Sequence, residues 1–558
     1  TKALESRLTD AVLDEAVRAQ PGSYRASEAS RVLLAGLRAR RDALPALSRE
    51  FFAVVNASAD VFGTDSRDLV EIDRAADGSV RVRIGGGDAR VAVDRTFLPS
   101  ETQEIRVYLQ DGDDRAVVRG SADESIVVRL TGGAGDDVLT DSSRVRKGGA
   151  RTLFYDASGS NTIIAGPVTR IDRRPYMTAQ PTGLEPDEEK RPPRAVLEER
   201  RGRFQDQWHN AASSASTPAP ATAGAPQFSG SRRAVHMVAD YKDGAGVIIG
   251  VGLSETAHGF RKAPHASALG VRGLYAIGSN GFGVQVDGDW RMPNSNRAVV
   301  ALMRASQFGS QRFYGYGNRT PRVPTREARI IRDEVTASVA LRWQPSRSSH
   351  LSIGPLVRWV QAREGPALAF QGADSPFGAL GAIAAIEHRA LDREATPHRG
   401  YRIALAATQY ADAWTATGAF GGVTGEGAAY LPVASATLAL RAGGRQNWGP
   451  FPIHEAALLG GRATVRGHDW NRFAGDAMAY GSSELRVPVA RVTLLARGDL
   501  GMILLADAGR VWRDGRSPGG WHTARGAGLS FATLGKAVSV VYARGEAGKL
   551  YGYFGFPF

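Results

Sequence analysis

The segment Ala337-Ser-Val-Ala-Leu-Arg-Trp343 alternates between two kinds of side chain. Its odd-numbered residues are small or apolar, whereas Ser338 and Arg342 stand at even positions. The segment Val284-Gln-Val-Asp-Gly-Asp-Trp290 repeats the alternation, with its valines opposed to polar residues. Because successive side chains of an extended chain point to opposite faces, this period of two predicts β-strands. Such strands fit either a soluble sandwich, whose apolar face lines a core, or a membrane barrel, whose apolar face meets lipid.

The number of such segments favours the barrel. The alternation begins at about Arg233 and continues to the end of the sequence at Phe558. At about 20 residues for each strand with its connection, this stretch holds roughly 16 strands of the length that a tilted bilayer crossing requires. The sequence therefore predicts an all-β dominated chain in which residues 233–558 form a 16-stranded antiparallel transmembrane β-barrel.

The composition agrees with turn-rich β structure. The chain has 66 glycines among 558 residues, and 43% of its residues are apolar, which suits β structure better than helix bundles. No stretch reaches the roughly 18 uninterrupted apolar residues of a spanning helix, so any membrane segment would be a barrel. The net charge of +13 comes from scattered arginines, which argues against nucleic acid as a partner. The chain has no cysteine, so it has no disulfide or thiolate metal site.

The first 56 residues predict a small helical segment. Apolar residues recur every three or four positions from Ala3 to Gln20 and again from about Ser27 to Val55. Pro45 is expected to interrupt the second helix, because proline lacks the N–H that a helix interior needs. Arginines between positions 38 and 41 are expected on its solvated side. Thr1 opens directly into helical sequence without a leader, so the natural protein is expected to carry more at its N-terminus.

Residues 57–170 contain an imperfect internal repeat. Its copies are Glu104-Ile-Arg-Val-Tyr-Leu-Gln-Asp-Gly-Asp-Asp114 and Ser125-Ile-Val-Val-Arg-Leu-Thr-Gly-Gly-Ala-Gly-Asp-Asp137, with a weaker copy from Thr152. Strand, Gly-Asp turn and strand at a period of about 20 residues predict a β-rich, solenoid-like domain or a stack of hairpins. Asp137 also fits the nonapeptide pattern of calcium-binding β-rolls. One copy is weak support for calcium, so structural turns are the favoured interpretation and a calcium site is the alternative.

Residues 171–232 change in character and predict a linker rich in Pro, Arg and Ala. Their Ala-Ser-Thr-Pro composition does not supply a core, and an extended segment is expected. Trp208 and His209 within it are interpreted as a local anchor and not as a site.

Several motifs follow one another in the C-terminal part of the chain. They are Asp392-Arg393 with Pro397 and Arg399-Gly400, then Leu459-Gly-Gly-Arg-Ala-Thr-Val-Arg-Gly-His468, Gly475-Asp476, Gly481-Ser-Ser-Glu-Leu-Arg-Val-Pro488 and Leu505-Ala-Asp-Ala-Gly509. In this combination the chain resembles the Omp85 superfamily of BamA/TamA-like outer-membrane barrels. The long central motif is similar to the sixth extracellular loop of that family, and the last is similar to a strand motif with an aspartate two residues before a glycine. The N-terminal region lacks recognisable POTRA repeats.

The resemblance implies a latch between the long loop and the barrel wall. In the family, the loop arginine pairs with the strand aspartate inside the barrel, which carries over here to Arg466 and Asp507. Glu484 is a second candidate partner. His468 stands where the family usually has an aromatic residue, which leaves room for a pH-sensitive contact. The candidate latch residues are Val465, Arg466, Gly467, His468, Glu484, Asp507 and Gly509.

The resemblance also implies a location and partners. Barrels of this family lie in the outer membrane of Gram-negative-type bacteria, which would place the N-terminal region in the periplasm. Outer-membrane lipids, the outer-membrane assembly machinery and unidentified protein clients or periplasmic proteins are the expected partners. Phe554, Phe556 and Phe558 are expected on one face of the last strand, as a C-terminal assembly signal. No cofactor is expected apart from the calcium alternative.

Two functions are compatible with such a barrel. The favoured one is insertion or translocation of protein or lipid through a lateral seam between the first strand, near Val235–Leu253, and the last strand, near Leu550–Phe558. The alternative is a non-catalytic membrane platform that anchors a periplasmic or upstream domain. A frayed seam would favour the first, and a fully hydrogen-bonded seam with a plugged lumen would favour the second. A soluble β-rich adhesin is a third hypothesis, which would need no detergent.

The sequence predicts no enzymatic activity. It contains no nucleophile elbow, no His-Glu-x-x-His and no phosphate-cradling loop. The aromatic segment Phe313-Tyr-Gly-Tyr-Gly-Asn318 is expected in a girdle of aromatic side chains at the membrane interface.

Overall fold

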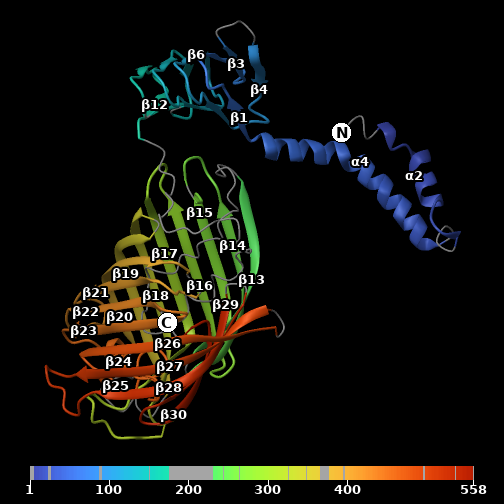
Figure 1. Cartoon of the computed structure of the whole chain (residues 1–558). Coiled ribbons are helices and arrows are strands. Elements are labelled where there is room, and N and C mark those ends of the chain that lie inside the picture. Colours follow the sequence, from blue (N-terminus) through green and yellow to red (C-terminus); the bar gives the residue numbers. More distant parts are fainter. Residues whose placement is uncertain are drawn as a thin grey trace. The chain divides into compact units, whose positions relative to one another are not determined.

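The computed structural model describes most of the chain. Its described residues are 6–22, 27–86, 91–149, 151–156, 158–174, 230–242, 244–262, 264–324, 326–346, 348–364, 376–393, 396–493, 497–533, 536–556 and 558. The greater part of the expected linker, with Trp208 and His209, lies outside these residues. The chain divides into two compact units, residues 1–176 and 177–558, and each is described by itself (Figure 1).

Two helices open the first unit. Helix α2 spans Asp10–Arg18 and helix α4 spans Glu28–Asn56. Helix α4 continues through Pro45, so the expected interruption there is wrong. The arginine side of α4 also differs from the expectation, because Arg38 and Arg41 form ion pairs with carboxylates of α2. Among the described residues, neither helix has the length and apolar character needed to cross a membrane.

The rest of the first unit is a β-solenoid with two sheets. The first sheet contains five strands in the order β1-β5-β7-β10-β12, all parallel. The second stacks β2, β6, β8 and β11 in parallel and is extended by the antiparallel strands β3 and β4. The strands are β1 Ser58–Phe62, β2 Asp68–Arg74, β3 Val80–Gly86, β4 Val91–Phe97, β5 Glu104–Tyr108, β6 Arg115–Ala122, β7 Val127–Thr131, β8 Val138–Asp141, β9 Arg144–Val145, β10 Thr152–Tyr155, β11 Thr162–Ile164 and β12 Thr169–Asp172.

The solenoid coils are slightly longer than the sequence repeat predicts. Glu104 lies beside Val127 and Val128 lies beside Thr152, which are offsets of 23 and 24 residues against an expected period of about 20. Val107, Leu130 and Phe154 stack at equivalent positions of successive coils and are fully buried. A continuous core between the two sheets therefore holds the coils together.

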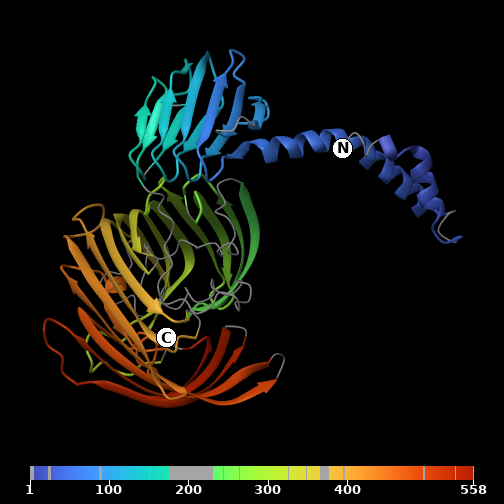
Figure 2. The ribbon, with the colours of Figure 1, turned by 45° about the horizontal axis from the view of Figure 1, so that its top comes forward.

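The second unit is a sheet of 16 antiparallel strands, as the sequence predicts. Each strand pairs with its neighbour in the chain, and the sheet curves into a barrel wall (Figure 2). The strands are β13 Ser231–Lys242, β14 Gly246–Ala257, β15 Ser267–Ala276, β16 Gly281–Arg291, β17 Arg297–Arg312, β18 Arg329–Ser346, β19 Ser349–Glu364, β20 Phe377–Leu391, β21 Gly400–Tyr410, β22 Phe420–Val433, β23 Ala436–Trp448, β26 Ala477–Thr493, β27 Arg497–Trp512, β28 His522–Thr533, β29 Lys536–Arg544 and β30 Gly548–Phe554.

The apolar face of the strands is their exposed face. Val339, Leu341 and Trp343 of β18 are all more than 40% exposed, whereas Ser338 on the opposite face is buried. Asp289 of β16 is likewise buried inside, and its neighbour Trp290 is exposed. A soluble sandwich would have the reverse arrangement, with apolar side chains in a core. An apolar exterior around a polar interior is typical of a transmembrane barrel.

The ends of the sheet differ in detail from the expectation. The segment expected as the first strand, Val235–Leu253, contains two strands, because β13 and β14 form a hairpin. The last strand β30 ends at Phe554 and not at Phe558. Gly555 has a φ of +107°, a value that favours glycine and that ends the extended run.

Candidate functional site: the lumen loop and the barrel seam

A long connection, residues 449–476, joins β23 to β26 and lies against the inner face of the wall. It contains the short helix η3 Ile453–Glu455 and the hairpin of β24 Ala457–Leu459 with β25 Phe473–Gly475. Gly460, Gly461 and Gly467 all have positive φ values, which glycine adopts without strain. These turns fold the sequence motif around Arg466 into a compact loop, here called the lumen loop.

Arg466 is the buried centre of the lumen loop. Its Nε and Nη2 donate to the two oxygens of Asp507 at 2.7 and 2.6 Å, and its backbone N–H donates to Oδ2 at 3.0 Å. Its Nη1 donates to Glu484 of β26. The side chains of all three residues are fully buried. The structure thus brings Arg466 together with both candidate partners. Each of these buried charges has a partner of opposite charge.

Gly509 explains why the loop approaches β27 so closely. A Cβ atom at Gly509 would lie 2.6 Å from Cγ2 of Val465 and 2.8 Å from Cδ1 of Leu459. Real side chains do not tolerate such distances, so the glycine makes room for these two loop side chains. Val465 and Leu459 are buried there with Phe473. Asp507 and Gly509 therefore act together: one binds the loop, and the other leaves space for it.

The far side of the loop contacts the last hairpin. The Gly467 N–H donates to the Tyr551 hydroxyl at 3.0 Å, and the Gly467 carbonyl accepts from the N–H of Ala547 at 2.9 Å. Asp469 forms an ion pair with Lys549. These contacts connect the loop to β30, which is one of the two edge strands of the sheet.

His468 packs in the same region. Its Nε2 lies 3.2 Å from the carbonyl oxygen of Thr523, and its Nδ1 lies 3.7 Å from Glu546. Burial lowers the pKa of His468, although Glu546 acts in the opposite direction. The imidazole is therefore neutral at neutral pH and packs beside Phe473, where the family pattern has an aromatic ring.

Two further anchors of the loop were missed in the sequence. Glu455 is buried and forms ion pairs with Arg358 of β19 and Arg445 of β23, both at 2.8 Å. Arg472 pairs with Glu546 at 2.9 Å, beside Thr320. No local motif marks these residues, because Arg358 and Glu546 are distant in the sequence from the loop residues that they bind. The sequence indicated these anchors only through Arg358 and Arg445, which stand at polar positions of otherwise alternating strands.

The aromatic segment 313–318 does not form a membrane girdle, so that expectation is wrong. Phe313 and Tyr314 are buried, and the Gly317 N–H donates to the carbonyl of Ala474 in the loop at 2.8 Å. Asn318 exchanges two hydrogen bonds with the backbone of Val511, at 2.8 and 3.0 Å. The segment therefore packs on the lumen loop and does not face lipid.

The C-terminal phenylalanines do not share one face of the last strand. Only Phe554 belongs to β30. Phe556 packs with inward-facing residues of β27 and β29, and the carbonyl of Phe558 accepts a hydrogen bond from Arg486 at 2.6 Å. Because Arg486 also binds Glu484 at 2.8 Å, Phe558 is connected to the latch. Their role as an assembly signal stays a prediction.

The seam between β13 and β30 is not paired in the described part of the chain. The hydrogen-bonded order runs from β13 to β30, and no pairing joins these two edges. Figure 2 shows the two ends of the curved sheet as separate edges. The edge strands also differ in length, with 12 residues in β13 and 7 in β30. An edge strand can offer backbone N–H and C=O groups to another strand, although the Gly552 carbonyl of β30 accepts from Arg462 at 3.4 Å.

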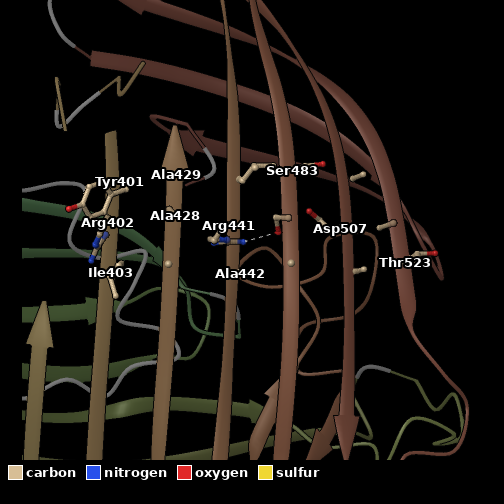
Figure 3. A pocket seen from close by; sticks show the side chains of 17 residues that line it. Tyr401, Arg402, Ile403, Ala428, Ala429, Arg441, Ala442, Ser483, Asp507 and Thr523 are labelled. Carbon is tan, nitrogen blue, oxygen red and sulfur yellow. Dashed lines mark hydrogen bonds between the residues drawn. The ribbon is translucent and has the colours of Figure 1, made fainter. Parts of the chain in front are cut away.

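A groove of about 850 Å³ lies on strands β21 to β28 (Figure 3). Tyr401, Ile403 and Leu440 line it and are exposed apolar side chains of the outer wall. Other outward positions of the groove carry small side chains, such as Ala442 and Ala506. The groove is therefore a depression in the lipid-facing surface and not part of the lumen.

Asp137 has a structural role in the solenoid turns. Its Oδ1 accepts the N–H of Asp114 at 2.9 Å, and Asp114 in turn accepts the N–H of Asp68 at 2.7 Å. Asn161 accepts the N–H of Asp137 at 2.8 Å. This ladder joins equivalent turns of successive coils. In the residues that the structure covers, no group of three or more acidic or histidine side chains is arranged to hold a metal ion.

Comparison with known families supports the assignment of the barrel. Residues 308–549 match the family model described as the Omp85 superfamily domain. This chain carries an Omp85 superfamily domain. The Omp85 domain includes Arg466, Glu484 and Asp507 together with the lumen loop, whereas β13 to β16 and the first unit lie outside the matched residues.

The solved structures that match this chain are distant from it in sequence. BamA from Haemophilus ducreyi lacking POTRA domains 1-3 is 13% identical, with 57% of this chain and 68% of that chain covered and a TM-score of 0.45. CdiB from Acinetobacter baumannii is 12% identical, covering 56% of each chain with a TM-score of 0.34. CdiB from Escherichia coli is 14% identical, covering 59% and 62% with a TM-score of 0.38. This chain thus spans less than two thirds of either CdiB chain, and no curated protein sequence matches it.

Proposed function

We propose that this Omp85 barrel inserts proteins into the outer membrane, or moves them across it, through the seam between β13 and β30. The observation that carries the proposal is that no strand pairing joins β13 to β30 among the described residues. Two unpaired edges offer backbone donors and acceptors to an incoming strand, which adds to the sheet by β-augmentation. Neither edge needs a catalytic residue for this, and we propose that the barrel is not an enzyme.

The lumen loop supports a route at the seam over a route through the barrel centre. Glu455, Arg466 and Arg472 bind the loop to three separate parts of the barrel. Because the loop is bound at three places, it covers part of the inner wall, so a client protein would have to displace it to pass through the barrel centre. The loop also contacts β30 through Gly467. We therefore propose that the latch holds β30 in place while β13 moves to accept a client strand.

A disulfide across the seam tests the proposal. The chain has no cysteine, so a pair such as Met237→Cys with Leu550→Cys introduces the only thiols, and neighbouring outward positions of the two strands supply alternative pairs. We expect the oxidised full chain in proteoliposomes to lose the ability to fold an added urea-denatured outer-membrane barrel protein. Reduction should restore the activity, and each single-cysteine variant should behave as the parent does.

Undiminished folding of the client by a fully cross-linked barrel would contradict the insertion proposal. That outcome would favour the platform function, in which the barrel anchors the first unit and the seam has no role. Loss of activity that reduction does not reverse would indicate damage to the barrel and not closure of the seam, and the single-cysteine variants detect this.

A further inference from the structure

The outer wall carries two neighbouring arginines at one end of the barrel. Arg525 is the fourth residue of β28, and Arg544 is the last residue of β29. They are direct cross-strand partners in the sheet, and both side chains are exposed. Within the described residues, neither forms an ion pair or a side-chain hydrogen bond. Like charges at directly opposed positions repel each other, so this pair is unfavourable unless an anion lies between them.

The pair lies on the lipid-facing surface and not in the lumen. Along β28 the exposed residues Arg525 and Leu529 share one face, and along β29 Arg544 shares its face with Tyr542 and Val540. These apolar neighbours are 45% to 60% exposed. An arginine on this face is costly at the middle of a bilayer and tolerated near the interface, where it reaches headgroups.

The arginine pair belongs to the end of the barrel with the longer connections. Residues 449–476 and 513–521 join neighbouring strands at this end, whereas β28 and β29 are separated by only two residues of sequence at the other. Longer connections are extracellular in barrels of this type. The pair therefore lies at the level of the outer-leaflet headgroups.

Among the wall residues that the structure describes, no carboxylate pairs with either arginine. The outward positions of β28 next to Arg525 are Thr523 and Ala527, and those of β29 and β30 next to Arg544 are Tyr542 and Gly548. Glu546 in the intervening turn binds Arg472. Two guanidinium groups without a protein anion, above an apolar belt, match a phosphate group on a lipid.

The groove of Figure 3 adds a place for the apolar part of such a lipid. Thr523 and Ala506 line it, and Ala506 is the direct cross-strand partner of Arg525. The groove thus reaches the arginine pair along the same outward face. Small side chains at its base leave room for an acyl chain, and the phosphate of the same molecule would meet Arg525 and Arg544.

We propose that Arg525 and Arg544 form a binding site for a phosphorylated lipid of the outer leaflet, with an acyl chain in the neighbouring groove. The phosphate oxygens accept hydrogen bonds from both guanidinium groups, which removes the repulsion between them. The bound lipid then covers the outer face of β26 to β29. The latch residues Glu484 and Asp507 lie on the inner face of the same part of the wall.

Lipid retention by the full chain tests this proposal. The chain is purified in a neutral detergent, mixed with lipid A that carries both phosphates, and examined by native mass spectrometry. We expect Arg525→Gln/Arg544→Gln to weaken lipid binding roughly tenfold relative to the parent chain, because two charge-assisted contacts are lost. Lipid A without phosphates should bind the parent as weakly as phosphorylated lipid A binds this variant.

A matched control removes two other exposed arginines from loops at the same end. Arg326→Gln/Arg516→Gln changes the net charge equally and should leave binding unchanged. An equal loss in both double variants would show a general charge effect and overturn the site. Equal binding of the parent and Arg525→Gln/Arg544→Gln would also overturn it, as would displacement of the lipid by an equal concentration of inorganic phosphate. If the double variant does not fold, Arg525→Gln alone is measured, with a smaller loss expected.

Discussion

Arg466 and Asp507 share three hydrogen bonds, one from the backbone N–H of Arg466 and two from its guanidinium group, at 2.6 to 3.0 Å. The carboxylate is therefore bound by main chain and side chain at once. This geometry fixes the direction of the loop backbone and neutralises the charge of Asp507. Glu484 accepts a hydrogen bond from the remaining side of the guanidinium group.

We expect Arg466→Ala and Asp507→Ala each to release the lumen loop. Arg466→Ala leaves Asp507 buried without its partner, and Asp507→Ala leaves Arg466 with Glu484 alone. Breaking a buried ion pair costs about 3–5 kcal/mol. The double variant should be little worse than either single variant, because both break the same contact. Protease sensitivity of residues 449–476 and client folding measure the effect. Strictly additive effects would mean that the two residues act independently.

Gly509→Ala should displace the loop without removing a charge. The added methyl group would lie 2.6 Å from Val465, and overpacking of this kind costs about 1–3 kcal/mol. Gly552→Ala is the matched control, because no atom lies within 4 Å of its Cβ position. Hydrogen exchange of the loop should rise in the first variant only. Val465→Ala combined with Gly509→Ala should recover part of the loss, and no recovery would argue against the close approach.

Glu455→Gln should loosen the first part of the loop and spare the second. Arg358, buried to 1% exposure, would lose the carboxylate that compensates it, and we expect a cost of about 3–5 kcal/mol. Exchange should therefore increase near residues 453–459, while residues near Arg466 stay protected. Equal deprotection of both parts would indicate that the loop unfolds as one unit and that the anchors are not separate.

The first unit should be more stable at pH 5 than at pH 8. Burial raises the pKa of Asp114 to about 6 and that of Asp156 to about 6. Both carboxyl groups thus bind a proton more tightly in the folded chain than in the unfolded chain, where their pKa is near 4. The resulting stabilisation is complete below about pH 4 and is lost as the pH rises through 6.

Hydrogen exchange in residues 58–172, corrected for its intrinsic pH dependence, measures this change, which we expect to be roughly 1–2 kcal/mol. Asp156→Asn should reduce the dependence of the stability on pH, whereas Asp111→Asn, at an exposed position, should leave that dependence unchanged. A profile that rises with pH in the parent chain would refute the assignment. Stabilisation by calcium at pH 8 would instead indicate that a cation neutralises the turns, and Asp137 would then be a ligand.

Removal of Phe558 should impair barrel assembly more than Trp521→Ala in an exposed connection. Phe558 lies over Arg441 and Arg486, with 4.7 and 5.2 Å between each guanidinium carbon and the ring centroid, and cation–π contacts of this kind contribute about 0.5–2 kcal/mol. We expect a lower amount of folded, heat-modifiable protein in the membrane. Equal amounts from both variants would count against the C-terminal assembly signal.

Much of the architecture followed from the sequence by itself. The alternation around Val339 and Val284 predicts strands because side chains of an extended chain point to opposite faces, and the length of the alternating region predicts 16 of them. The motifs at Arg466 and Asp507 predicted a contact through resemblance to a family. The repeat ending in Asp114 and Asp137 predicted a solenoid, since equal segments stack into equal coils.

Other features depended on distances that no local pattern contains. Whether Val339 faces lipid or a core is decided by the curvature of the whole sheet, because the same alternation fits both arrangements. The pairing of Glu455 with Arg358 joins residues that are far apart in the chain, and the burial of Phe313 under the loop has the same origin. Pro45 lies within helix α4 although it lacks the N–H of other residues. Side-chain chemistry and period were determined by the sequence, whereas the unpaired seam and the partners of each buried charge were decided by tertiary structure, since they depend on which distant segments meet.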